Sequence, residues 1–186
     1  MFERFFPDHT VASAYDIDFE KLYHQGYRGV LFDIDNTLVE HGSAADAKAK
    51  KLFHRLDKIG FEYCLISNNK MKRVHSFNET IGAHMVFNAH KPARKGYYYA
   101  MDLMGTRPEN TIFVGDQLFT DIFGAKRIGL KNYLVKPINA REEIQIVLKR
   151  KLEWIVLREY RVRKREEKRK KRWKRQQRKK YFVRHR

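Results

Sequence analysis

Residues 29–37 read GVLFDIDNT, an apolar run that passes directly into a polar turn with two carboxylates. The first four residues, Gly29 to Phe32, are typical of a strand buried on both faces, as parallel strands are. Asp33 and Asp35 then stand at the carboxyl end of this strand, and the polar turn ends at Thr37. Ligands of open parallel sheets bind beyond the carboxyl ends of the strands. The stretch therefore predicts both a parallel sheet and the place of its functional site.

Strand and helix patterns alternate along the rest of the chain. Short apolar runs predict strands, whereas helical spacing of apolar residues and glycine stops predict helices. Strands are expected over 61–67, 84–87, 111–115 and 130–135, and helices over 44–59, 70–80, 94–104, 120–128 and from Arg141 onward. This alternation predicts right-handed crossovers with helices on both sheet faces. The fold class is therefore α/β, a three-layer sandwich around a mostly parallel central sheet.

Positive charge is concentrated at the C-terminal end of the chain. The 186 residues carry a net charge of +18, and residues 158–186 alone have 17 Lys or Arg and 3 Glu, a net charge of +14. The difference, +4, is ordinary for a globular enzyme. The length suits one α/β domain with an appendage. We therefore predict a globular domain over 1–157 and a basic helical tail over 158–186.

The single cysteine and the lack of a long apolar run bear on location. Cys64 has no partner for an internal disulfide, and its apolar neighbours predict a buried strand position. No run approaches the roughly 20 apolar residues of a transmembrane helix. The first seven residues also lack the apolar segment of a signal peptide. We expect a cytoplasmic protein without a transmembrane segment, with peripheral contact at a membrane surface left open.

The polar residues that follow three expected strands should meet in one crevice. These are Asp33 to Thr37, Ser67 to Asn69, and Gly115 to Asp121. Attack by the Asp33 carboxylate on phosphorus would form an acyl phosphate, while Asp35 could protonate the leaving oxygen and later deprotonate water. Carboxylates repel an anionic phosphate, so this chemistry requires a cation. An all-oxygen set of ligands suits Mg²⁺.

Each of these motifs also has a purely structural interpretation. A polar turn explains two nearby aspartates, Ser67 can cap a helix, and Lys91 can be a surface lysine. A calcium-binding loop starting at Asp33 is excluded, because that loop requires Gly and Glu where Leu38 and Ala44 stand. The eight histidines show no zinc-ligand spacing. It is the joint occurrence of the motifs in one order, mostly at strand ends, that favours the catalytic interpretation.

Together these residues resemble the four motifs of haloacid-dehalogenase-like (HAD) phosphatases. The matching motifs are Asp33-x-Asp35-x-Thr37, Ser67, Lys91-Pro92, and Gly115-Asp116 with Asp121, within residues 28–136. The resemblance implies a Rossmann-like fold. It further implies a nucleophile (Asp33), a general acid/base (Asp35), phosphate-binding residues (Ser67, Asn68 and Lys91), Mg²⁺ ligands (Asp33, Asp116 and the Asp35 backbone carbonyl), and an auxiliary acid near the metal or Lys91 (Asp121).

A narrower resemblance bears on the substrate. The segment from Phe6 to Val39 resembles the YqeG-like subgroup of HAD subfamily IIIA, which is similar to mitochondrial and plastid phosphatidylglycerophosphate phosphatases. Asp35 also favours a phosphatase or phosphotransferase, since dehalogenases and transport ATPases of this type lack an acid there. The resemblance therefore implies phosphatidylglycerophosphate as the favoured substrate.

The gaps between motifs are too short for a cap domain. Only 21 residues lie between Val39 and Phe61, and 21 between Asn69 and Lys91. An open site suits a bulky substrate such as a lipid head group, although a neighbouring subunit could act as a lid, so an oligomer is left open.

The basic tail leaves three interpretations. It can bind an anionic lipid surface, bind RNA, or have no partner. With RNA as the partner, the alternative function is an RNA- or ribosome-associated protein with a secondary phosphatase site.

Overall fold

The computed structural model describes residues 2–139 and 144–184, with side chains for 2–139 and 152–175. The chain forms two compact units, one of residues 7–142 and one of residues 1–6 together with 143–186. The sheet lies in the first unit, and the long C-terminal helix lies in the second. The domain boundary expected at residue 157 stays a prediction.

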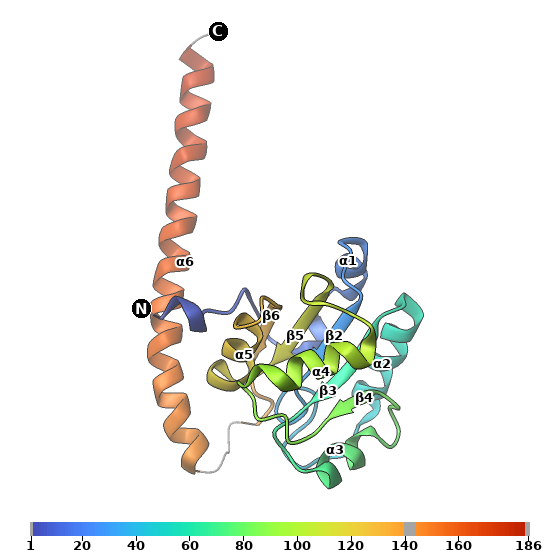
Figure 1. Ribbon diagram of the computed structural model, residues 1–186. Coiled ribbons are helices and arrows are strands. Elements are labelled where there is room, and N and C mark those ends of the chain that lie inside the picture. Colours follow the sequence, from blue (N-terminus) through green and yellow to red (C-terminus); the bar gives the residue numbers. More distant parts are fainter. Residues whose placement is uncertain (1, 140–143, 185–186) are drawn as a thin grey trace. The chain divides into compact units, whose positions relative to one another are not determined.

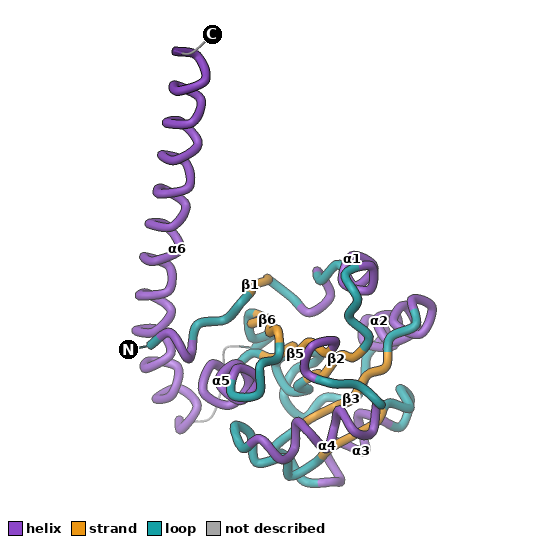
Figure 2. Tube along the Cα trace, turned by 45° about the horizontal axis from the view of Figure 1, so that its top comes forward, coloured by secondary structure: helices purple, strands orange, loops and turns teal. Residues whose placement is uncertain are grey.

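Six strands form one sheet in the order β1-β6-β5-β2-β3-β4, and every neighbouring pair is parallel. β2 lies between β5 and β3, with Phe32 opposite Val114 on one side and Leu65 on the other. β1 is an edge strand beside β6 (Figure 2). The strand bounds are β1 His9–Val11, β2 Gly29–Phe32, β3 Glu62–Ile66, β4 His84–Val86, β5 Thr111–Gly115 and β6 Lys131–Val135.

Alternate residues of the central strands face two separate apolar clusters. In β2, for example, Val30 and Phe32 belong to one cluster and Leu31 to the other. Helices α1 (Phe19–His24), α2 (Ala47–Ile59) and α3 (Met71–Asn78) cover the first face, and α4 (Arg94–Met104) and α5 (Phe123–Lys126) cover the second. Figure 1 shows α4 and α5 in front of the strands. The predicted three-layer α/β sandwich is confirmed.

Local side-chain chemistry sets the ends of the helices. The Asp46 carboxylate accepts a hydrogen bond from the Ala49 N–H at 2.8 Å, so α2 begins three residues later than its apolar pattern suggests. Its last turn ends at Gly60, whose φ of +95° lies in the left-handed region that glycine adopts readily. Cys64 is buried in β3 as predicted, and burial raises the pKa of its thiol to about 12.

The helix expected over 120–128 is present over 120–126, but its first residues are not α-helical. Residues 118–122 instead form a π-helical turn, in which both Asp121 and Ile122 donate backbone hydrogen bonds to the Gln117 carbonyl oxygen, and the short α5 follows. The Asp121 carboxylate in turn accepts a hydrogen bond from the Gln117 N–H at 3.1 Å. Single wide turns of this type are common at functional sites. Here the turn brings Asp121 back beneath the end of β5.

The second unit is built on α6 (Ile144–Arg184). The ring of Phe6 meets that of Tyr160 edge to face at 5.4 Å, and Arg163 pairs with both Glu3 and Glu159. Side chains 164–175 are all exposed, in agreement with the basic composition of this segment. No helix within the described residues has the length and apolarity that a bilayer span requires.

Some expectations for this unit fall outside what the structure describes. The expected start at Arg141 lies outside the described residues. So do the side chains of Ile144, Val147, Leu148, Tyr181 and Phe182.

Candidate active site

The polar residues expected in one crevice stand at the ends of adjacent strands. Asp33 follows β2, Ser67 follows β3 and Asp116 follows β5, and these three strands are neighbours in the middle of the sheet. All three side chains are buried, as is that of Lys91, which comes from the loop between β4 and α4. The fold therefore gathers the four sequence motifs at one edge of the sheet.

Asp33 is fixed by hydrogen bonds to both of its carboxylate oxygens. Its Oδ1 accepts from the Lys91 ammonium at 2.6 Å, and its Oδ2 accepts from the Thr37 hydroxyl at 3.2 Å. Thr37 lies in the turn that follows the strand, so the short motif supplies both the acceptor, Asp33, and one of its hydrogen-bond donors. The carboxylate has a defined orientation at the end of β2.

Three buried carboxylates form a cluster around this position. Asp33, Asp116 and Asp121 each offer an oxygen, and these oxygens lie within 4.8 Å of one another. The approach of Asp121 depends on Gly115, because a Cβ there would lie 2.5 Å from the Asp121 Oδ2. The Lys91 ammonium contacts two of these acids, Asp33 and Asp121. The cluster therefore fits a divalent cation, for which carboxylate oxygens are suitable ligands.

Lys91 is the cationic centre of the cluster. Burial opposes the charged ammonium, but Asp121 and Asp33 outweigh this effect and raise the pKa of Lys91 above its ordinary value. Its Nζ lies 2.7 Å from Asp121 Oδ1 and 2.6 Å from Asp33 Oδ1. The lysine is therefore charged in the folded protein and joins two of the three acids.

Asn68 holds the backbone of Lys91. Its Oδ1 accepts from the Lys91 N–H at 2.6 Å, and its Nδ2 donates to the Lys91 carbonyl oxygen at 3.1 Å. The Asn68 side chain is thereby engaged in placing the lysine, so any contact with phosphate would come from its backbone N–H. Ser67 accepts a hydrogen bond from the Asn69 N–H at 3.1 Å, and its own hydroxyl proton can be donated to a phosphate.

The Asp35 side chain lies outside the carboxylate cluster. It accepts hydrogen bonds from the Gly42 N–H, the Asn69 amide and the Arg73 guanidinium. The side chains that cluster as possible metal ligands are thus Asp33, Asp116 and Asp121. The contribution expected from Asp35 to the metal is its backbone carbonyl oxygen, which stays a prediction.

Arg73 is a site residue that the sequence reasoning missed. It lies in the first turn of α3, and its Nη2 donates to Asp35 Oδ1 at 2.8 Å. The sequence could have indicated it, because the helix expected over 70–80 begins soon after the strand that ends at Ser67. The first turn of such a helix lies at the ligand-binding end of the sheet.

Binding of a divalent cation is expected to weaken as the pH falls below about 6. Burial raises the pKa of Asp33 to about 6; Lys91 opposes this rise, and Asp121 adds to it. A carboxylate must be deprotonated to bind a metal, so Asp33 begins to lose metal affinity at a higher pH than an exposed aspartate near 4. Calorimetric Mg²⁺ titrations from about pH 8 to about pH 5 should show up to about tenfold weaker binding per pH unit below this pKa. Constant affinity over that range would contradict the assignment.

Comparisons with known proteins point to one family. A family model described as HAD-hydrolase-like matches residues 88–145. The chain is 34% identical over 140 residues to a protein of Bacillus subtilis described as a probable phosphatase, YqeG, covering 74% of this chain and 81% of that protein.

A more distant relative and a solved structure extend this similarity. The chain is 27% identical over 165 residues to phosphatidylglycerophosphate phosphatase 1 of Arabidopsis thaliana, covering 83% of this chain and 47% of that protein. A candidate 3-deoxy-D-manno-octulosonate 8-phosphate phosphatase from Vibrio cholerae superimposes with a TM-score of 0.51 at 15% identity, covering 69% of this chain and 78% of that one. The structural likeness concerns the fold.

Proposed function

Because the chain belongs to the HAD-like hydrolases and is a phosphatase of that family, we propose that it hydrolyses phosphate monoesters through an aspartyl phosphate on Asp33, with Mg²⁺ as its metal. The observation that carries the proposal is the place of Asp33. Its carboxylate is oriented at a strand end, beside a buried lysine and two further buried carboxylates.

The first half of the proposed reaction transfers the phosphoryl group to Asp33. A carboxylate oxygen of Asp33 forms a bond to phosphorus while the bond from phosphorus to the leaving oxygen breaks. A proton from Asp35 goes to that oxygen, so the product leaves as a neutral alcohol. Lys91, Ser67 and the backbone N–H of Asn68 are the donors proposed to bind the phosphoryl oxygens.

The second half returns the enzyme to its starting state. Water attacks the phosphorus of the aspartyl phosphate and gives a proton to Asp35, after which the bond to Asp33 breaks and inorganic phosphate leaves. When bound, Mg²⁺ would offset the repulsion between the phosphate and the acidic residues. Asp33, Asp116 and the Asp35 carbonyl are its proposed ligands, with Asp121 beside them.

Phosphatidylglycerophosphate is the substrate that we propose. The similarity to the plant phosphatase supports it. So does the short chain between the strands, where α2 alone follows β2 and α3 alone follows β3, with no cap domain over the site. An open site accommodates a head group at a lipid surface better than a small soluble ester that needs enclosure.

Phosphate release should be fastest from phosphatidylglycerophosphate in a screen of phosphorylated lipids, sugars and nucleotides with Mg²⁺. Contacts to the lipid head group add binding energy that a small ester cannot supply, so kcat/KM should exceed that of glycerol 3-phosphate by about tenfold or more. Transfer to an added alcohol, measured in the same assay, distinguishes a phosphotransferase. Equal or faster hydrolysis of a sugar or nucleotide phosphate would remove the lipid from the proposal.

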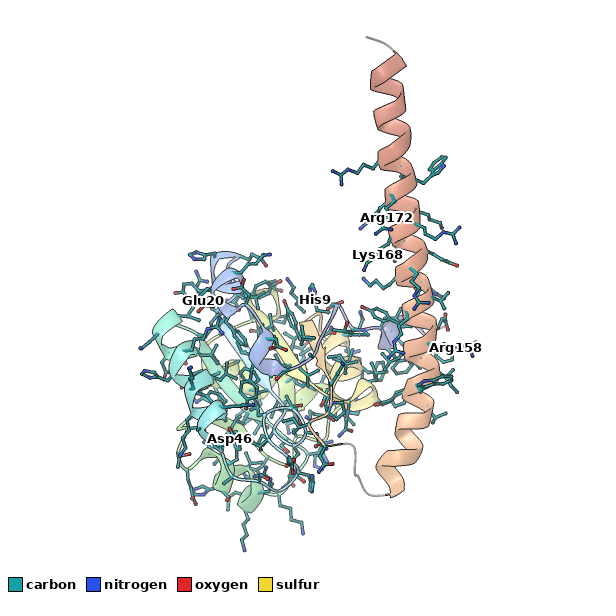
Figure 3. All side chains as sticks on the ribbon, turned by 180° about the vertical axis from the view of Figure 1, so that it is seen from behind. His9, Glu20, Asp46, Arg158, Lys168 and Arg172 are labelled. Carbon is teal, nitrogen blue, oxygen red and sulfur yellow. The ribbon has the colours of Figure 1, made fainter. Side chains whose placement is uncertain are left out.

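The basic segment 158–186 is proposed to form a separate tail that binds an anionic lipid surface at the cytoplasmic face of a membrane. Arg158, Lys168 and Arg172 project from α6 (Figure 3). Ile155, Val162 and Trp173 are three of the five exposed large apolar side chains on the described part of α6, and they are spaced by seven and eleven residues, close to whole numbers of turns. They share one face, as in helices that lie in a membrane interface.

Replacement of Lys168, Lys170 and Lys171 by Gln in the full chain should weaken binding to anionic vesicles on the order of 100-fold, at about 1 kcal/mol per basic residue. Co-sedimentation with and without anionic lipid measures this loss. The variant with Ser at Ile155, Val162 and Trp173 separates lipid from RNA: it should lose vesicle binding and keep RNA binding. The opposite result would favour the RNA- or ribosome-associated alternative.

A further inference from the structure

Four hydrogen-bond donors hold the Asp35 carboxylate. Its Oδ1 accepts from the Gly42 N–H at 2.8 Å and from the Arg73 Nε and Nη2 at 3.2 and 2.8 Å, and its Oδ2 accepts from the Asn69 Nδ2 at 2.6 Å. An ionised carboxylate offers about two lone-pair directions on each oxygen, so the three donors to Oδ1 engage that oxygen fully. To turn Oδ1 toward a leaving oxygen at Asp33, Asp35 must give up at least one of these partners.

Arg73 is the partner best suited to be displaced by a substrate. The Gly42 donor is a backbone group, and Asn69 lies in the loop that follows β3, whereas Arg73 reaches Asp35 through a long side chain. About 16% of the Arg73 side chain is exposed, so the residue is not wholly enclosed. A guanidinium binds carboxylate and phosphate equally well through two parallel hydrogen bonds. An anion can therefore replace Asp35 on Arg73.

The guanidinium also has an unused donor. Its Nη1 is buried, and within the described residues it has no hydrogen-bond partner. A buried donor without an acceptor is unfavourable, and a bound anion would supply the missing acceptor. An anion held by Nη1 and Nη2 would satisfy this group while it withdraws Nη2 from Asp35.

We propose that Arg73 recognises a second anionic group, a phosphodiester carried by the leaving alcohol of the substrate, and that this contact releases Asp35 toward the leaving oxygen. The inference rests on the phosphatase function proposed above. Esters without the second anion leave Asp35 held by Arg73 and react slowly. Binding of the correct substrate thus completes the catalytic arrangement, so selectivity appears in the turnover as well as in the affinity.

The test compares two esters of glycerol, one of which carries an additional glycerophosphoryl group and with it the second anion. Deacylated phosphatidylglycerophosphate carries a phosphodiester on the leaving glycerol, and glycerol 3-phosphate does not. The wild-type enzyme should prefer the first. Arg73→Gln should lower kcat/KM for the diester-bearing substrate by about 10- to 100-fold, the value of one charge-assisted contact. The same variant should raise kcat for glycerol 3-phosphate, because Arg73 no longer holds Asp35.

Changes of opposite sign cannot come from general damage to the fold. Lys72→Gln removes the same charge from an exposed neighbour on α3 and should change neither substrate's kinetics. Arg73→Lys keeps the charge without the planar fork and should recover part of the lost affinity; it also carries the test if Arg73→Gln does not fold. A parallel fall for both esters, or a wild type without preference, would overturn the inference and leave the phosphatase intact. A wild type inactive on every ester would overturn both.

Discussion

Asparagine in place of Asp33 is expected to reduce phosphate release on the order of 10⁴-fold or more, as the loss of a covalent nucleophile does in other enzymes. The amide is close in shape to the carboxylate, but it is neutral and a poor nucleophile. Its oxygen can still accept a hydrogen bond from Lys91 or Thr37, so the surrounding contacts of Asp33 are largely retained. The loss should therefore appear in kcat with the fold preserved.

Single-turnover assays with Mg²⁺ measure this effect, and thermal unfolding verifies that the variant is folded. The matched control is Asp102→Asn, which removes a carboxylate from an exposed position of α4 and should leave turnover unchanged. Acid-quenched wild-type enzyme should carry a phosphoryl group on Asp33, detectable by mass spectrometry. If Asp33→Asn retains turnover within tenfold of the wild type, Asp33 is not the nucleophile.

Methionine in place of Lys91 should have two large effects, one on catalysis and one on stability. Met keeps much of the side-chain length and removes the cation. We propose that this ammonium binds the transferring phosphoryl oxygens, and its loss should then lower kcat by about 10²- to 10³-fold. The ammonium also pairs with Asp33 and Asp121 in a buried setting, and removal of one partner of such a pair costs about 3–5 kcal/mol of unfolding free energy.

The stability effect should depend on the metal. Without a divalent ion, three buried carboxylates remain with no lysine beside them, whereas Mg²⁺ would restore part of the lost stability. Urea unfolding without Mg²⁺ measures the loss of stability, and unfolding with Mg²⁺ measures how much of it the ion restores. Lys95→Met, at an exposed position of α4, is the control and should change the free energy of unfolding by less than about 0.5 kcal/mol. If the metal-free Lys91→Met variant is as stable as the wild type, the lysine does not offset the repulsion among the buried carboxylates.

The central part of the fold could be predicted because its strands are buried on both faces. Runs such as that of β2 are continuously apolar, and polar residues mark their ends. The strand bounds expected from the sequence therefore agree with those of the structure within about a residue or two. β1 could not be predicted, since His9–Val11 has one apolar residue and its pairing comes from β6. The short helix Phe19–His24 has too few residues for helical periodicity to be visible.

The candidate site could be predicted where a residue directly follows a strand. Asp33, Ser67 and Asp116 needed only the strand ends and the parallel order of the sheet. The direction of the Asp35 side chain could not be predicted, because it is decided by Arg73 and Asn69, which lie 38 and 34 residues away in the sequence. The π-helical turn that brings Asp121 into the cluster was missed for a similar reason, since a wide turn has no composition that distinguishes it from an α-helix.

The position of β1 has a consequence for biosynthesis. Of the six strands of the sheet, this one is synthesised first, yet it pairs with the last of them, and Asp8 binds Asn132, which is 124 residues later. At translation rates of roughly 5–20 residues per second, about 6 to 25 s pass before its partner emerges. β2 and β3 are close in sequence and can associate much earlier. Within this sheet the first strand to be synthesised is therefore the last to join, and it covers the edge of β6, which would otherwise be open to other chains.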